Sequence, residues 1–185
     1  MLRAFIKACK SIKKNCDPAL SSIDIDLKKA RCPACKAPAS LQRHATYSRH
    51  YVFIEGGALQ DRPIDIVRLR CMSCKKTHAV LPFSAVPYSP FSVAFIACLL
   101  IDYDNGRFAS IEGLCGHYGI AINTFYNLSK RFLASVRLAV GITCTDRSRL
   151  RIARMLISAD MARIDGFLSG FFDMAGRSFC QPQGP

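Results

Sequence analysis

The chain has 185 residues, 50% of them hydrophobic, which is enough for one domain or two small ones with a real core. No apolar run approaches the ~18 residues of a transmembrane helix, and lysines interrupt the apolar part of the N-terminus, which argues against a signal peptide. The net charge of +13 indicates a phosphate-rich partner. Anionic lipid is the less favoured partner, because no segment combines basic charge with a continuous amphipathic face.

Residues 1–31 are predicted to form a basic N-terminal arm. Apolar side chains recur at helical spacing over residues 1–14, with lysines around them, which predicts a short helix. Residues 21–29 then alternate apolar and charged side chains, a pattern typical of a strand or an extended arm.

Two C-x2-C motifs follow, formed by Cys32 with Cys35 and by Cys71 with Cys74. Two thiolates at this spacing fit one tight turn, and two such turns complete a tetrahedral four-sulfur site. Four thiolates leave no open coordination position, so we predict one structural Zn²⁺ per chain. A disulfide framework and uncoordinated thiols are the alternatives. His78 could also replace one of the cysteine ligands, although a solvent-facing or capping role is the simpler interpretation.

The residues between the two motifs suit a β-hairpin. Residues 46–54 and 64–70 are predicted strands, because the first is rich in β-branched and aromatic residues and the second alternates, with a glycine pair between them. Residues 75–82 add a third short strand. Residues 32–82 are therefore predicted to be a zinc ribbon, and the proline-rich residues 83–91 a linker.

Residues 92–160 are predicted to form a helical domain. Ser92 is expected to cap a strongly apolar helix over residues 93–103, and Ser110 a second helix over residues 111–118. Gly119 then breaks the pattern before a third helix over residues 120–133. The expected fold class is α+β: a small β-rich zinc ribbon followed by a helix-turn-helix-like domain.

The second and third predicted helices match a helix-turn-helix pattern. Cys115 is the small residue where two helices nearly touch, Gly119 is the turn, and the apolar positions are Leu114, Tyr118, Ile120, Phe125 and Leu128. The third helix would then present side chains that contact base edges and phosphates in a major groove: Asn123, Thr124, Tyr126, Asn127, Lys130 and Arg131. A plain helical hairpin with a glycine turn is the alternative.

The basic charge is unevenly distributed along the chain. Residues 91–133 carry three basic and three acidic side chains, whereas residues 32–90 carry eight basic and three acidic ones. If DNA is bound, phosphate contacts must therefore come largely from the ribbon, where we select Arg68, Arg70, Lys75 and Lys76. Four arginines in a predicted fourth helix are either further phosphate contacts or a solvated surface: Arg147, Arg149, Arg151 and Arg154.

Residues 161–185 are predicted to be a C-terminal tail rich in phenylalanine and glycine. Its aromatic side chains would be costly to expose, so we expect part of the tail to dock on the protein or on a partner. Six cysteines outside the two motifs are irregularly spaced, which fits a reducing cytoplasm better than a secreted disulfide scaffold.

Residues 32 to about 132 resemble bacterial zinc-ribbon proteins of unknown function that are themselves similar to the N-terminal parts of transposases. The matching segments are Cys32-Pro33-Ala34-Cys35, Arg49-His50-Tyr51, residues 68–82 and Val86-Pro87-Tyr88. The resemblance implies a helix-turn-helix after the ribbon and a mobile-element or regulatory role on DNA. Such transposases continue into a ribonuclease-H-like domain with three metal-binding carboxylates. Here the later aspartates have no α/β pattern around them, so we expect no autonomous nuclease.

Two classes of function remain after these considerations. The first is a DNA-binding protein, transposition-related or a transcriptional regulator, that acts on double-stranded DNA in the bacterial nucleoid, with homodimerisation open. The second is an interaction module whose ribbon and tail dock a transposase or polymerase-type partner. No nucleophile–base pair and no open metal site is evident, so we expect the protein not to be an enzyme.

Overall fold

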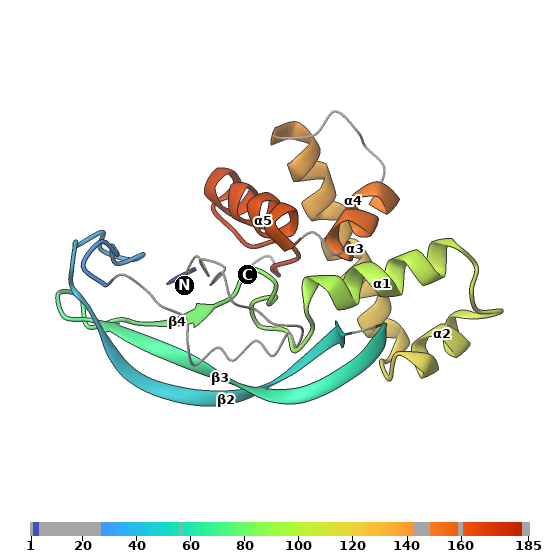
Figure 1. The fold of residues 1–185 in the computed structure, drawn as a ribbon, viewed down its shortest axis with the longest axis horizontal. Helices are drawn as coiled ribbons and strands as arrows, with labels where there is room; N and C mark the ends of the chain where they lie inside the picture. Colours follow the sequence, from blue (N-terminus) through green and yellow to red (C-terminus); the bar gives the residue numbers. More distant parts are fainter. Residues whose placement is uncertain (1, 4–26, 56, 143–148, 159–160, 183–185) are drawn as a thin grey trace. The chain divides into compact units, whose positions relative to one another are not determined.

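The structure, a computed structural model, describes residues 2–3, 27–55, 57–142, 149–158 and 161–182. These residues form a mixed α+β fold, which confirms the predicted class (Figure 1). Its elements are β1 (Leu2–Arg3), β2 (Leu41–Glu55), β3 (Ala58–Cys71), β4 (Thr77–Leu81), α1 (Val93–Asp104), α2 (Ile111–His117), α3 (Ile122–Ile142), α4 (Arg149–Leu156) and α5 (Met161–Ala175). Within the described ranges, no helix has both the length and the apolar character needed to cross a membrane.

The chain divides into two compact units. The first comprises residues 1–51 and 62–83 and contains both C-x2-C motifs; we call it the metal unit. The second comprises residues 52–61 and 84–185 and contains the five helices; we call it the helical unit. The hairpin formed by β2 and β3 contributes residues to both units. Its two strands are also longer than the two predicted ones.

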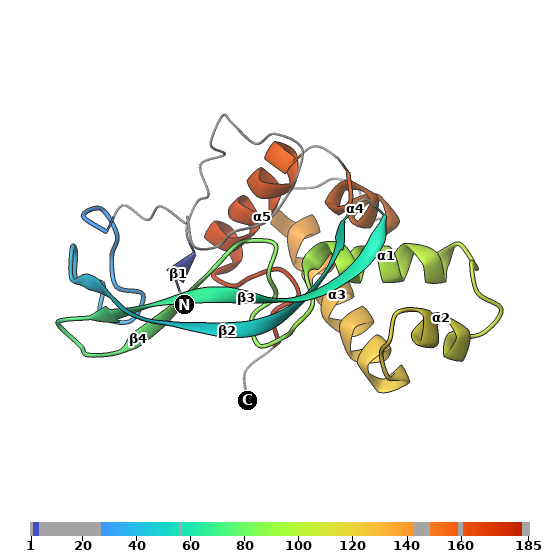
Figure 2. The ribbon, with the colours of Figure 1, turned by 60° about the horizontal axis from the view of Figure 1, so that its bottom comes forward.

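The sheet has the strand order β1-β4-β3-β2, and β4 lies beside β3 in both views of the ribbon (Figures 1 and 2). β3 and β4 are antiparallel, with Leu69 opposite His78, while β1 pairs in parallel with β4. Leu2 and Arg3 thus form a strand and not the start of the predicted N-terminal helix. The remainder of that helix, and most of the strand predicted before the first cysteine motif, lie outside the described residues.

The buried positions of β3 change phase part-way along the strand. Ile64 and Ile66 are buried, and two residues later the alternation would bury residue 68, but Arg68 is exposed and Leu69 and Cys71 are buried instead. Successive side chains in a strand point to opposite sides. The buried side of β3 therefore changes at Val67 and Arg68. The alternation of apolar and polar residues in the sequence is interrupted at the same place.

The predicted helix caps are confirmed. The Ser92 hydroxyl accepts from the Phe95 backbone N–H at 3.0 Å, and the Ser110 hydroxyl accepts from the Gly113 N–H at 3.1 Å. Each bond satisfies one of the backbone donors that the first turn of a helix leaves unpaired. Helix α1 is the most buried helix of the unit, with apolar side chains on nearly all sides, and α2, α3 and α4 pack on it.

Gly119 ends α2 through a Schellman motif. Its φ is +63°, the Ile120 N–H donates to the Cys115 carbonyl at 3.0 Å, and the Gly119 N–H donates to the Gly116 carbonyl at 3.2 Å. These two bonds satisfy carbonyls that would otherwise be orphaned, and only glycine enters this conformation without a steric cost. The apolar positions expected on either side are buried, with one exception, Ile120, which is partly exposed.

Both aspartates near the end of α1 are paired within the helical unit. Asp102 accepts from the Tyr118 hydroxyl at 2.8 Å and from Arg107 at 2.9 Å, and burial together with this carboxylate raises the pKa of Tyr118. Asp104 forms a two-bond ion pair with Arg149 of α4. Arg149 thus has a structural partner. Arg151 and Arg154 have exposed side chains, and Arg147 lies outside the described residues.

The C-terminal phenylalanines pack inside the helical unit. Phe179 is 2% exposed and meets Phe132 of α3 and Phe171 of α5 edge-on. The Cys180 N–H donates to the buried Ser135 hydroxyl at 2.9 Å, which ties the segment after α5 to α3. Much of the predicted tail is therefore a helix followed by a docked segment.

We expect Gly119→Ala to lower the free energy of unfolding of the helical unit by about 1 kcal/mol, because alanine is strained at positive φ. Gly116→Ala is the matched control: it lies within α2, its new Cβ would meet nothing within 4 Å, and it should be neutral or stabilising. Chemical denaturation followed by far-UV circular dichroism checks both. Equal effects of the two substitutions would show that the turn has no special requirement for glycine.

Candidate metal centre and basic surface

The two C-x2-C motifs fold into equivalent turns. In the first, the Cys32 N–H donates to the Ala37 carbonyl at 3.0 Å and the Lys36 N–H donates back to the Cys32 carbonyl at 2.9 Å. In the second, Cys71 makes the same two bonds, both at 2.9 Å, with the two lysines that follow the motif. Lys36 and Lys75 share a left-handed φ of about 62° and 61°. The repeated Cys-x-x-Cys-Lys sequence therefore encodes one conformation twice.

These turns bring all four thiols together. The sulfurs of Cys32, Cys35, Cys71 and Cys74 lie within 4.8 Å of one another, with one contact of 3.7 Å from Cys32 to Cys74 and one of 3.6 Å from Cys35 to Cys71. A tetrahedron of 2.3 Å zinc–sulfur bonds has edges of about 3.8 Å. The four predicted ligands are thus assembled as free thiols at a separation that fits a metal ion. This arrangement can bind a metal.

Hydrogen bonds favour the thiolate form at the two deeply buried sulfurs. The Cys74 backbone N–H and the Ser40 hydroxyl, which lies 3.3 Å from the sulfur, lower the pKa of Cys71 to about 5. The Cys35 backbone N–H likewise lowers the pKa of Cys32. At Cys35 the Ala37 N–H also lowers the pKa, but partial desolvation and the neighbouring thiols outweigh it and raise the value to about 11. Cys35 therefore becomes a thiolate at neutral pH only when a cation stabilises its charge.

His78 contacts the cluster from outside. Its Nε2 lies 3.4 Å from the Cys32 sulfur, and the ring is 8% exposed on the buried face of β4, opposite Leu69. The four sulfurs alone form the group whose ligand atoms are mutually close. His78 is thus placed as a hydrogen-bonding neighbour of a ligand, and burial lowers its pKa, which favours the neutral imidazole. Ser40 could not be identified from its sequence position, because its contact with Cys71 depends on the fold.

Residues 32–110 match the family model described as a domain of unknown function, DUF6431. The matched segment begins at the first metal-site cysteine, includes the whole hairpin, β4 and α1, and ends at the cap of α2. No curated protein and no solved structure matches the chain. The matched domain has no assigned activity.

The four basic residues selected in the ribbon are exposed. Arg68 and Arg70 lie on β3, and Lys75 and Lys76 follow the second turn. The guanidinium carbon of Arg68 lies 5.4 Å from the centre of the Tyr47 ring on β2. This cation–π contact could not be predicted from the sequence. In β2, residues 42–48 are exposed on both sides of the strand.

Charge is concentrated in the metal unit. Its described residues carry twelve basic side chains and one acidic side chain, Asp65, whereas those of the helical unit carry nine basic and seven acidic ones. The twelve are Arg3, Lys28, Lys29, Arg31, Lys36, Arg43, Arg49, Arg62, Arg68, Arg70, Lys75 and Lys76. The basic character of the chain therefore belongs mainly to the unit that holds the cysteine cluster.

The residues predicted to contact DNA on the third helix lie on α3. Asn123, Tyr126, Asn127 and Lys130 are exposed, while Thr124 and Arg131 are partly exposed. The buried side of the same helix consists of Phe125, Leu128 and Phe132. The amphipathic division expected from the sequence is thus present, and it leaves the polar residues accessible.

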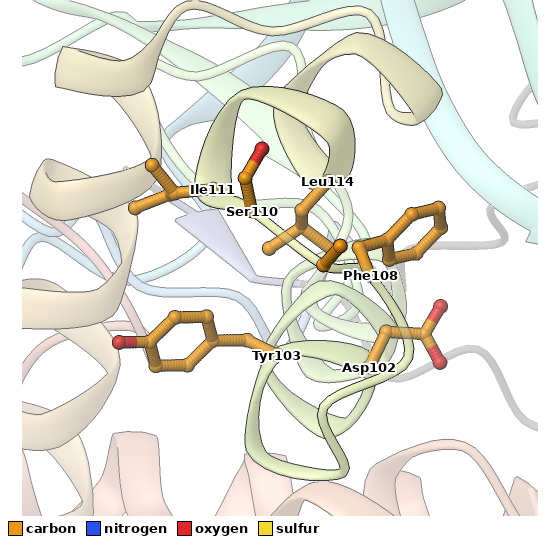
Figure 3. Close-up of a pocket in the computed structure, with 7 residues that line it drawn as sticks. Asp102, Tyr103, Phe108, Ser110, Ile111 and Leu114 are labelled. Atoms are coloured by element: carbon orange, nitrogen blue, oxygen red, sulfur yellow. The ribbon is translucent and has the colours of Figure 1, made fainter.

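A pocket of about 140 Å³ lies between the end of α1 and the start of α2 (Figure 3). Tyr103, Phe108, Ile111 and Leu114 supply most of its lining, and Asp102 lies at its margin with its carboxylate already bonded to two partners. Ligand pockets usually exceed about 300 Å³. We interpret this one as a packing gap between two helices.

We expect the purified protein to contain one metal ion per chain and Cys71→Ser to lose most of it, because a hydroxyl replaces a thiolate in a closed four-sulfur site. Cys98→Ser is the matched control, since Cys98 is a free thiol on α1 outside the cluster. Elemental analysis measures both. Full metal content in the Cys71 variant would show that Cys71 is not a ligand of the metal site.

The same assay separates the two roles of His78. As a hydrogen-bonding neighbour, His78→Ala should keep one metal per chain and weaken metal affinity about 10- to 100-fold. Competition with a chromophoric chelator measures this affinity. Loss of stoichiometric binding would instead identify His78 as a ligand.

Proposed function

We propose that this protein binds double-stranded DNA and that its cysteine cluster holds a structural Zn²⁺. The observation that carries the proposal is the charge of the metal unit, twelve basic side chains against one acidic. Electrostatic attraction to phosphate supplies most of the sequence-independent affinity of DNA-binding proteins. Zinc is the ion that four thiolates of this geometry usually bind in structural sites.

Helix α3 is proposed as the element that reads sequence. The Schellman turn at Gly119 joins a short capped helix to a longer one, an arrangement that a helix-turn-helix shares with other helical hairpins. Asn123 and Asn127 are exposed one turn apart, and an asparagine can pair with two atoms of an adenine edge. Lys130 and Arg131 lie further along the helix and suit phosphate contacts.

The chemistry of the metal unit favours a binding role over a catalytic one. A four-thiolate site has no open coordination position for water or substrate. A transposition-related or regulatory role is the form of DNA binding that the resemblance to transposase N-terminal regions suggests. It remains part of the proposal.

Docking to a protein partner is the competing proposal, with a transposase or polymerase subunit as its expected partner. Its expected docking surfaces are the predicted ribbon and the phenylalanine-rich tail. Phe171 and Phe179 are buried within the helical unit, so their rings are already used for packing. This packing favours DNA binding as the first hypothesis.

Charge reversal tests the basic surface. We expect replacement of Arg68, Arg70, Lys75 and Lys76 by glutamate to weaken binding to all duplex sequences and to reduce the slope of log affinity against log salt by about three to four. Fluorescence anisotropy at several salt concentrations measures both quantities.

The matched control makes the same change in net charge on the helical unit, at four exposed arginines: Arg137, Arg151, Arg154 and Arg163. Its salt slope should stay close to that of the unmodified protein. Equal losses in the two variants would mean that net charge alone, or the arginines of the helical unit, governs binding.

Two substitutions on α3 test the reading of sequence. Asn127→Ala should relax the preferred sequence, with a loss of about 1–3 kcal/mol of discrimination, and leave nonspecific binding nearly intact. Lys130→Ala should weaken binding to every sequence alike. A selection for bound DNA sequences followed by affinity measurements tests both variants. Uniform losses across sequences, or no losses, in the two variants would exclude α3 as a recognition helix.

A further inference from the structure

We propose that the sheet face carrying Tyr47 and Arg68 binds an unpaired nucleic-acid strand, with a base stacked on Tyr47 and its phosphates contacted by Arg68 and Arg70. The inference rests on the proposed nucleic-acid binding and adds a substrate class to the metal unit. Tyr47 has no part in the duplex binding proposed above.

The strand register places the three side chains on one face. Arg68 lies opposite Ala79 and Arg70 opposite Thr77, and residues directly opposite each other in antiparallel strands share a face. The Arg68 guanidinium lies over the Tyr47 ring, so Tyr47 of β2 belongs to this face as well. Leu69 and His78 point to the other, buried face.

The face is accessible and free of acidic groups. Tyr47 is 38% exposed, and Arg68 and Arg70 are exposed, while the β4 positions on the same face bear only the small side chains of Ala79 and Thr77. No aspartate or glutamate occurs in residues 27–54 or 66–83. An anionic strand laid on this face would therefore meet mainly basic side chains. The acidic side chain among the described residues of the metal unit, Asp65, is exposed on β3 three positions before Arg68.

The ring decides which kind of nucleic acid fits. In a duplex the bases are stacked on one another, so an aromatic side chain on a sheet surface finds phosphates and no free base face. Unpaired strands offer base faces, and sheets that bind them combine exposed aromatic rings with basic side chains. A cation–π pair that only stabilised the hairpin would form equally well if the Tyr47 ring were fully covered by other side chains. The partial exposure of Tyr47 is what points to a ligand.

The test compares a fluorescein-labelled single-stranded DNA of mixed sequence with its own duplex, using the full-length metal-loaded protein. Tyr47→Ala should weaken binding to the single strand about 5- to 100-fold and leave duplex binding unchanged. Tyr47→Phe keeps the ring and should bind like the unmodified protein. Tyr88→Ala removes another exposed tyrosine, in the helical unit, and should have no effect on the single strand.

Tyr47→Leu guards against a folding defect, because it keeps a large side chain in the strand without an aromatic face; metal content and thermal unfolding verify its fold. Full single-strand affinity in this variant, or equal losses on both probes, would overturn the inference. A protein that binds the duplex and not the single strand would also overturn it and leave the proposed function intact. Binding to neither probe would refute the proposed function itself, and the inference with it.

Discussion

Four thiols within 4.8 Å of one another are a constraint on everything around them, because their negative charges cannot coexist without a cation. Two backbone hydrogen bonds hold each of the two turns of the metal unit that carry these thiols. One strand of its hairpin has seven successive residues exposed on both sides. The described buried apolar side chains of the unit include Leu41, Tyr51, Ile64, Ile66, Leu69, Val80, Leu81 and Phe83. Small units of this kind usually depend on a metal or a disulfide for stability. Here the cysteine cluster is able to bind such a metal.

The same constraint changes how the charge of the chain should be counted. The net charge of +13 treats every thiol as neutral. Four thiolates with one divalent cation carry a formal charge of about −2, so the loaded centre is itself anionic. Lys36 and Lys75 follow the two cysteine motifs directly, and Lys76 comes next to the second. These lysines offset part of the charge of the centre, and together with the arginines of β3 they leave positive charge available to an anionic partner.

Local signals accounted for the parts of the fold that could be predicted from the sequence. The two cysteine motifs, the alternation of the hairpin strands, the two serine caps and Gly119 each act within a few residues. The structure contains the cysteine cluster, the hairpin strands, the two caps and the turn after α2. The contacts of Ser40 and Tyr47 could not be predicted, because they join residues far apart in the chain. The helical character of residues 161–175 was missed because glycine and phenylalanine are weak helix formers, and packing against α3 overrode that preference.

The change of phase in β3 has a consequence for how this domain can vary among relatives. Ile66 and Leu69 are both buried although they lie three positions apart, so the strand contains two alternating patterns joined at Val67 and Arg68. Deleting one of these two residues would merge the patterns and send one buried set to the solvent side. Length changes at this junction should therefore be rare in evolution, whereas the hairpin end at residues 55–58 can lengthen freely. A designer who wished to graft the metal unit onto another protein would have to keep this junction intact.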